Sequence, residues 1–200
     1  MTALQEEIAA AAARWVVEEG LEYGPAKSRA ARELGAGRRS VWPDNDQVEQ
    51  AVREYIAVFC ADSQAQELAA LRALACQWME RLQDFRPHLA GAVWRGTATR
   101  LNDICLQLFC DDPKSAELAL IDQGVRFQPS AVTGFQGEAV DALSFSCLCP
   151  GLGEEVGIHL MVHDHDDLRG ALQPDRQGRR ARGDLKALLA LLQAPEGVSL

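Results

Sequence analysis

The chain has 200 residues, of which 48% are hydrophobic and 24% are charged, and its formal net charge is -9. Such a chain builds one compact domain or two small ones, and its apolar share excludes disorder as the main state. Its acidic balance argues against a protein that coats nucleic acid. Apolar runs stop short of the ~18 residues that a membrane span requires, and no secretory signal pattern is present, so we expect a cytoplasmic protein without membrane contact.

Residues 1–85 have the periodicity of helices. Apolar side chains recur there at three- and four-residue spacing, and glycines such as Gly20 and Gly35 interrupt the pattern. This spacing predicts four helices, over Ala3–Glu19, Ala26–Leu34, from an Asp44 or Asn45 cap to Cys60, and Ser63–Leu82. We expect residues 1–85 to form a helical N-terminal region, which is also the candidate surface for a protein partner.

After Pro87 an alternation of period two replaces the helical pattern. It predicts five strands, at Leu89–Trp94, Asp103–Cys110, Val125–Phe127, Val140–Leu148 and Val156–His163. Helices are expected at Pro113–Gln123 and Asp184–Leu192. The fold class is therefore α+β, with one region at residues 1–85 and a second at residues 86–200 that carries a small mixed sheet.

Most of the familiar catalytic motifs are absent from the sequence. There is no P-loop, no dinucleotide-binding glycine pattern, no zinc-protease helix motif and no nucleophile elbow. The six cysteines lack the paired spacing of structural zinc sites, and we interpret them as reduced thiols.

The most informative stretch runs from Gly91 to Asp112. A predicted strand ends at Gly96 and Thr97, a turn carries Arg100, and Asp103 opens the next strand. A glycine lets backbone approach an oxyanion, a hydroxyl and an arginine bind phosphate, and a carboxylate holds Mg²⁺. These four residues therefore predict a phosphate and metal site at one edge of the sheet.

This stretch resembles the nucleotidyltransferase superfamily of DNA polymerase beta, whose pattern is Gly-Ser, roughly ten residues, then Asp-x-Asp on a strand. Gly96 and Thr97 match the Gly-Ser, and Asp103 matches the first aspartate. Cys105 stands where the second aspartate belongs, and a neutral thiol is a poor ligand for Mg²⁺. For a third carboxylate on a later strand, the sequence offers Asp141, or Glu138 just before it.

The resemblance covers roughly Leu89 to His163 and implies a nucleotidyltransferase-type sheet on which the helical region packs. It implies a nucleoside triphosphate ligand, held at Gly96, Thr97 and Arg100, with Mg²⁺ at the catalytic Asp103. Because Cys105 degrades the metal site, we expect a divergent member that binds a nucleotide or similar phosphate ligand and transfers a nucleotidyl group only if the metal site still works. The alternative is a non-catalytic binding or regulatory module that keeps the fold.

A second metal hypothesis follows from strand alternation. Asp103 and Cys105 share one face of their strand, and His159 and His163 share one face of a later strand. If those faces adjoin, the four side chains suit zinc or iron better than magnesium. The nearby acidic and histidine run at residues 163–167 is interpreted as the turn into a following helix.

Two segments are locally basic, at residues 27–39 and 169–186. Helix, glycine and short basic helix also occur in helix-turn-helix DNA-binding proteins, with Arg29 and Arg32 as the candidate contacts. Plain helical hairpins show the same pattern, and solvated basic faces are common. We therefore expect that DNA is not the partner.

Overall fold

A computed structural model of the chain describes residues 2–37, 40–134, 137–174 and 178–193. It contains helices and one six-stranded mixed sheet, which confirms the α+β class. The chain divides into two compact units, Met1–Leu68 with Thr97–Leu101 and Ala69–Gly96 with Asn102–Leu200, here called the helical unit and the sheet unit. The division falls within helix α4 (Gln64–Arg81) and not at residue 85, where the periodicity of the sequence changes.

The helical unit contains α1 (Ala3–Glu19), α2 (Tyr23–Glu33), α3 (Asn45–Phe59) and the start of α4. Capping boxes begin two of the helices: Thr2 and Gln5 exchange side-chain and backbone hydrogen bonds at α1, and Asp44 and Gln47 do so at α3. Gly20 ends α1 with a φ of 66°, a left-handed conformation that favours glycine. The first helix therefore has the bounds that the sequence predicts.

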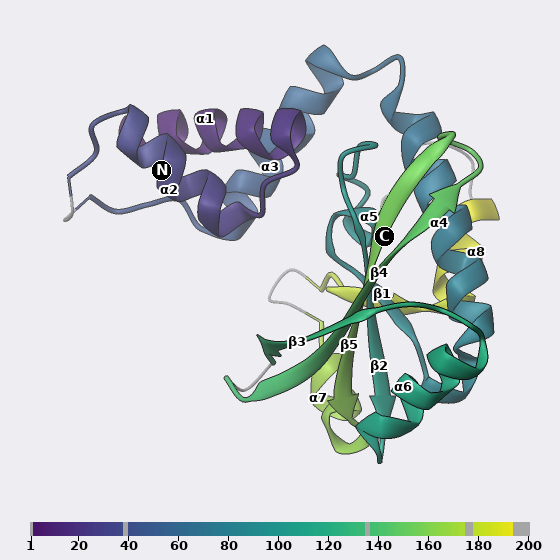
Figure 1. Cartoon of the computed structure of the whole chain (residues 1–200). Coiled ribbons are helices and arrows are strands. Elements are labelled where there is room, and N and C mark those ends of the chain that lie inside the picture. Colours follow the sequence, from purple (N-terminus) through teal and green to yellow (C-terminus); the bar gives the residue numbers. More distant parts are fainter. Residues whose placement is uncertain (1, 38–39, 135–136, 175–177, 194–200) are drawn as a thin grey trace. The chain divides into compact units, whose positions relative to one another are not determined.

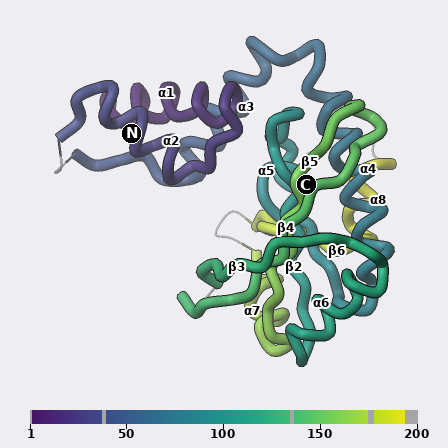
Figure 2. Tube along the Cα trace, in the orientation of Figure 1, coloured from purple at the N-terminus to yellow at the C-terminus, as the bar shows by residue number. Residues whose placement is uncertain are grey.

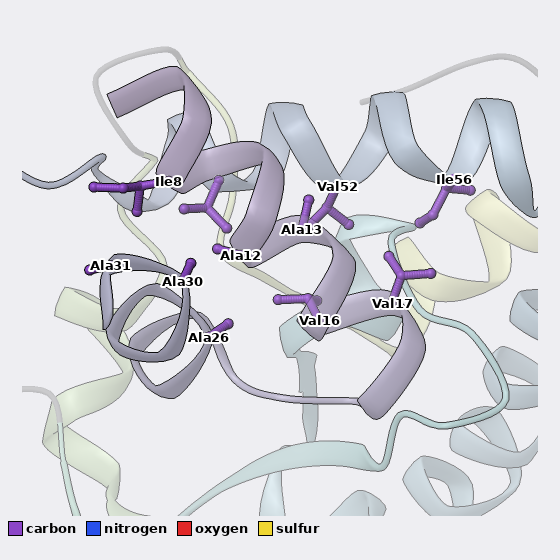
Figure 3. Close-up of a cluster of buried hydrophobic side chains, with 11 residues drawn as sticks. Ile8, Ala12, Ala13, Val16, Val17, Ala26, Ala30, Ala31, Val52 and Ile56 are labelled. Carbon is purple, nitrogen blue, oxygen red and sulfur yellow. The ribbon is translucent and has the colours of Figure 1, made fainter. Parts of the chain in front are cut away.

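Small side chains build the core of the helical unit. Figure 3 shows Ala12 and Val16 of α1 near Ala26 and Ala30 of α2, with Val52 of α3 behind them. Because alanine adds little bulk, the helix backbones can approach closely and bury these faces almost completely.

The sheet unit has strand order β3-β4-β5-β2-β1-β6 (Figures 1 and 2). Its strands are β1 (His88–Ala90), β2 (Ile104–Cys110), β3 (Gln128–Thr133), β4 (Ala139–Cys149), β5 (Glu154–Asp164) and β6 (Arg182–Asp184). β2 and β5 are parallel, and the other neighbouring pairs are antiparallel. The remaining elements are η1 (Gln83–Phe85), α5 (Gly91–Arg95), α6 (Pro113–Asp122), η2 (His165–Asp167), α7 (Leu168–Ala171) and α8 (Leu185–Gln193).

Helices α4, α6 and α8 lie on one side of the sheet (Figure 1). The strand residues that face them are apolar and buried, among them Leu106 of β2 and Leu160 of β5. Trp78 of α4 packs on Phe145 of β4 with ring centroids 4.6 Å apart. The main core of the unit is therefore on this face, while the other face carries polar side chains together with buried ones such as Phe109.

Three local elements differ from the sequence prediction. The strand expected over Leu89–Trp94 ends at Ala90, because Gly91, with a φ of 72°, turns the chain into α5. The strand expected over Val125–Phe127 begins instead at Gln128, since the Val125 N–H donates to the Leu120 carbonyl and extends the end of α6. β6 was not expected, because three residues give too little alternation to detect.

Candidate functional site

The strand register places one side chain from each of the six strands in a single line. Pairing runs from Arg182 through Ala90 to Cys105, then through His159 and Ser144 to Gln128. Residues paired across neighbouring strands point to the same face, so these six side chains form one row. We call it the polar row, and it lies on the face opposite Leu106 and Leu160.

Asp103, just before β2, is tied to the polar row by hydrogen bonds. Its Oδ2 lies 3.0 Å from His159 Nε2, and its Oδ1 accepts the Gly157 N–H at 3.1 Å. His159 Nδ1 in turn lies 2.8 Å from the Ser144 hydroxyl. The hydrogen bond from His159 holds the pKa of the Asp103 carboxyl below its ordinary value, and the Gly157 N–H adds to this against the opposing effect of burial.

The hydrogen-bonded series of side chains Asp103, His159 and Ser144 is accessible to solvent and can move a proton. The Asp103 side chain is 54% exposed and that of His159 is 44% exposed. With Asp103 accepting from one ring nitrogen, the other is positioned to take a proton from the Ser144 hydroxyl. Each partner comes from a different segment, so the sheet register and not a local motif assembles them.

These residues do not fit the magnesium centre that the nucleotidyltransferase resemblance implies. That centre needs a set of carboxylates, whereas the side chains that adjoin Asp103 in the sheet are the thiol of Cys105 and the imidazole of His159. His159 also occupies one carboxylate oxygen of Asp103 by hydrogen bonding. A single carboxylate engaged in this way is a poor site for two magnesium ions.

The expected third carboxylates lie elsewhere. Asp141 is exposed on β4 and pairs with Val162, which places it on the face opposite His159. Glu138 precedes β4 near His163, toward the far end of β5 from Asp103. The structure thus brings neither Asp141 nor Glu138 to Asp103.

The alternative soft-metal set is only partly assembled. β2 and β5 do adjoin, and Cys105 pairs in register with His159. His163, however, pairs with Phe109, four residues farther along β5 and about 13 Å away at ~3.3 Å per residue. Asp103 and His159 therefore meet, while His163 belongs to a different part of the face.

The expected phosphate-binding residues are divided between the two units. Gly96 and Asp103 belong to the sheet unit, and Thr97 and Arg100 belong to the helical unit. Gly96 ends α5 with a φ of 80°, its N–H donating to the Ala92 carbonyl, so it serves as a helix cap. Thr97 is buried, and the Arg100 N–H donates to Glu67 within the helical unit. Neither unit by itself holds all four residues.

Ser144 and Gly157 were not found from the sequence, and Arg182 was identified only as part of the basic segment 169–186. The spacing of Ser144 and Ser146 on one face of β4 is a signal of a polar face, but it does not say which strand lies beside it. Arg182 required the position of β6, which the sequence does not reveal.

Two of the basic residues of α2, Lys27 and Arg29, have structural partners, and the cysteines are thiols. All six cysteines are free thiols, and burial raises the pKa of Cys110. Lys27 donates to Asn45 at 2.8 Å, and Arg29 pairs with Glu19 at 2.7 Å while lying over the Trp15 ring. Arg38, Arg39 and Arg176 lie outside the described residues.

Comparisons with known proteins do not identify a family for this chain. No protein-family model matches the chain, and no curated protein matches it. In the part of the chain that the structure describes, no helix combines the length and the apolar character needed to cross a membrane.

Proposed function

We propose that the sheet unit is a divergent nucleotidyltransferase-like domain that binds a nucleotide or related phosphate ligand on its polar row without magnesium-dependent transfer. The order of elements around Asp103 agrees with this proposal. β1 is followed by a glycine, then by Asp103 and β2, and a later strand, β5, lies parallel beside β2. This is the sequence of elements that the resemblance implies.

The glycine of the family pattern fits Gly91 better than Gly96. Ten residues, 93–102, separate Gly91 and Ala92 from Asp103, whereas only five, 98–102, follow Gly96 and Thr97. Gly91 directly follows β1, has a φ of 72°, and would place a Cβ 3.7 Å from the Cys105 Cβ. A glycine at the strand end and beside Cys105 supports the proposal, with Ala92 in place of the serine.

The observation that carries the proposal is the Asp103–His159 hydrogen bond. It supports a scaffold in which the His159 imidazole, and not a metal ion, binds the carboxylate of Asp103, the one aspartate that is left of the family pattern. Transfer through two magnesium ions then lacks its ligands, while a surface for binding remains.

Arg182 supplies the cationic group that a phosphate ligand requires. Arg182 pairs with Ala90 in the polar row. The side chain of Ala90 is small, and the Arg182 guanidinium interacts electrostatically with Cys105 on the far side of it. Burial lowers the pKa of Arg182, but guanidinium stays charged at neutral pH and binds phosphate oxygens in pairs. We therefore assign Arg182 as the phosphate contact, because both ring nitrogens of His159 are already engaged by Asp103 and Ser144.

Thermal unfolding tests this proposal. The purified chain is screened against the four nucleoside triphosphates, each with Mg²⁺, Mn²⁺ or EDTA. A ligand at ~100 times its dissociation constant adds about 2.7 kcal/mol to the folded state, which shifts the melting temperature measurably. We expect a shift that persists in EDTA, disappears in Arg182→Gln and survives in the exposed control Arg126→Gln. A shift that requires metal, or none with any nucleotide, contradicts the proposal.

Introducing carboxylates beside Asp103 distinguishes two interpretations of the sheet unit, a degenerate enzyme scaffold and an interaction module. The double variant Cys105→Asp, His159→Asp places three carboxylates around the start of β2 and β5. The scaffold interpretation expects it to gain Mn²⁺ binding, measured by electron paramagnetic resonance, over the wild type. Lack of any gain favours the alternative, a non-catalytic module whose exposed Val58 and Phe59, 70% and 68% accessible, meet a protein partner.

A further inference from the structure

A second cluster of metal-ligating side chains lies at the opposite end of β5 from Asp103. Glu138, His163 and Asp167 each offer one ligand atom, and these atoms all lie within 4.8 Å of one another. We propose that this cluster is a binding site for a divalent transition-metal ion of the zinc or manganese class. Its three ligands differ from the residues assigned to the proposed nucleotide site, since His163 lies about 13 Å along β5 from His159 at ~3.3 Å per residue, but Arg182 acts electrostatically on His163 and so links the two.

His163 is held rigidly on the sheet. It is 1% exposed, and its ring stacks on Phe109 of β2 with centroids 5.4 Å apart and planes 24° from parallel. Burial lowers its pKa, as does Arg182, while Asp167 and Glu138 act in the other direction.

Glu138 is positioned by a glycine in the turn between β3 and β4. A Cβ at Gly134 would overlap the Glu138 carboxyl group and come within 2.8 Å of Val140 Cγ1. The Gly134 N–H also donates to the Glu138 carbonyl at 2.7 Å. The carboxylate therefore lies directly over the space that Gly134 leaves, packed against the hairpin that carries it.

Asp167 reaches His163 because the chain turns back after β5. Asp164 begins η2 by accepting the Asp166 N–H at 2.8 Å, and the single 3₁₀ turn that follows returns Asp167 to the strand end. The run of residues 163–167 is thus a turn, as expected, and the turn itself brings two potential ligands together.

The donor set selects the class of ion. One imidazole nitrogen with two carboxylate oxygens suits zinc, manganese or iron(II), whereas Mg²⁺ and Ca²⁺ prefer oxygen alone. Ligands that bind at ~2.0–2.2 Å lie roughly 3–4 Å apart, so small side-chain movements close the cluster around an ion. Two carboxylates and Arg182 leave a net negative charge for a dication. Three protein ligands also leave a position open for water or another ligand.

Cobalt(II) titration of the EDTA-treated full chain tests the site. Its visible spectrum distinguishes nitrogen and oxygen ligands from thiolates, which matters in a chain with six cysteines. We expect one ion per chain without a thiolate charge-transfer band, displaced by zinc. Glu138→Gln and Asp167→Asn, which keep side-chain size, should each weaken binding about tenfold or more. The exposed control Asp166→Asn, and Asp103→Asn at the other site, should bind as the wild type does.

Several results would overturn the assignment. They are an absence of cobalt and zinc binding by the wild type, a spectrum dominated by thiolate, or equal affinity in the Glu138→Gln, Asp167→Asn double variant. Circular dichroism and the melting temperature of the metal-free variants show whether they remain folded. If a carboxylate variant unfolds, the melting temperature of the wild type decides instead, because a specific site predicts that it rises with zinc concentration and that EDTA reverses the rise.

Discussion

Replacing Gly157 by alanine tests the hydrogen-bonded geometry of Asp103 directly. An added Cβ would lie 2.5 Å from Asp103 Oδ1 and 2.8 Å from Oδ2, so the carboxylate must rotate away from His159 and from the Gly157 N–H. The backbone of Gly157 is not left-handed, and alanine fits it. The expected change is therefore local to the carboxylate.

The stability change in Gly157→Ala should be small and dependent on pH. Two hydrogen bonds to a half-exposed carboxylate contribute about 1 kcal/mol in total, and alanine in a strand offsets roughly 0.5–1 kcal/mol of this loss. Because the folded-state pKa of Asp103 is lowered, its contribution is present above the ordinary pKa and is lost as the pH falls through the folded value. The variant is thus least favourable, relative to the wild type, near neutral pH.

The decisive measurement is the pKa of Asp103 by carboxyl carbon NMR. We expect it to rise toward the ordinary aspartate value in Gly157→Ala. The matched control is Gly170→Ala, where an added Cβ meets nothing within 4 Å, and it should leave the Asp103 pKa unchanged. A pKa that stays low in Gly157→Ala would refute the idea that His159 and Gly157 hold the carboxylate.

Three further predictions concern stability. Asp44→Ala removes the capping box shared with Gln47 and should cost the helical unit about 1 kcal/mol, measured by thermal unfolding followed by circular dichroism. Leu106→Ala empties a fully buried position in β2 and should cost about 2–5 kcal/mol in urea unfolding, whereas Leu148→Ala, 58% exposed, should change stability by less than ~0.5 kcal/mol. Burial chiefly lowers the pKa of His88, opposed by its hydrogen bond to Arg86 and by Asp184, so its contribution is full above about pH 6.5 and is lost as the pH falls further. Urea unfolding at about pH 7.5 and about pH 5.5 should therefore show a smaller pH dependence in His88→Gln, and an unchanged one would contradict this.

The elements with a clear period were predictable from sequence. The apolar spacing from Ile8 to Val16 fits only a helix with one buried face, and the alternation from Val156 to Val162 fits only a strand with one buried face. Both elements form as expected. Gly91–Arg95 was not predictable, because its apolar residues fit a strand equally well. Its helix depends on distant packing, in which Trp94 donates to the Arg180 carbonyl and fills the space above Gly183.

The site was predictable only within one strand at a time. Alternation correctly placed His159 on the side of β5 away from the buried Ile158, but sequence gives no register between strands. The pairing of Cys105 with His159, and of Ser144 with His159, depends on hydrogen bonds between segments some 15 to 54 residues apart. The same limit applies to Glu138 and His163, whose proximity follows from the pairing of β4 with β5.

The polar row also has a consequence for how such a surface changes over time. Each of its six side chains is the contribution of a separate strand, and the pleat keeps all of them away from the core on the helix-covered side. At partly exposed positions of the row, such as Cys105, Ser144 and His159, a substitution can therefore alter one chemical group with little change to the core, whereas Ala90 is buried. Carboxylate, thiol and imidazole can replace one another singly, so a sheet of this kind can lose one chemistry and acquire another by single steps, without passing through an unfolded protein.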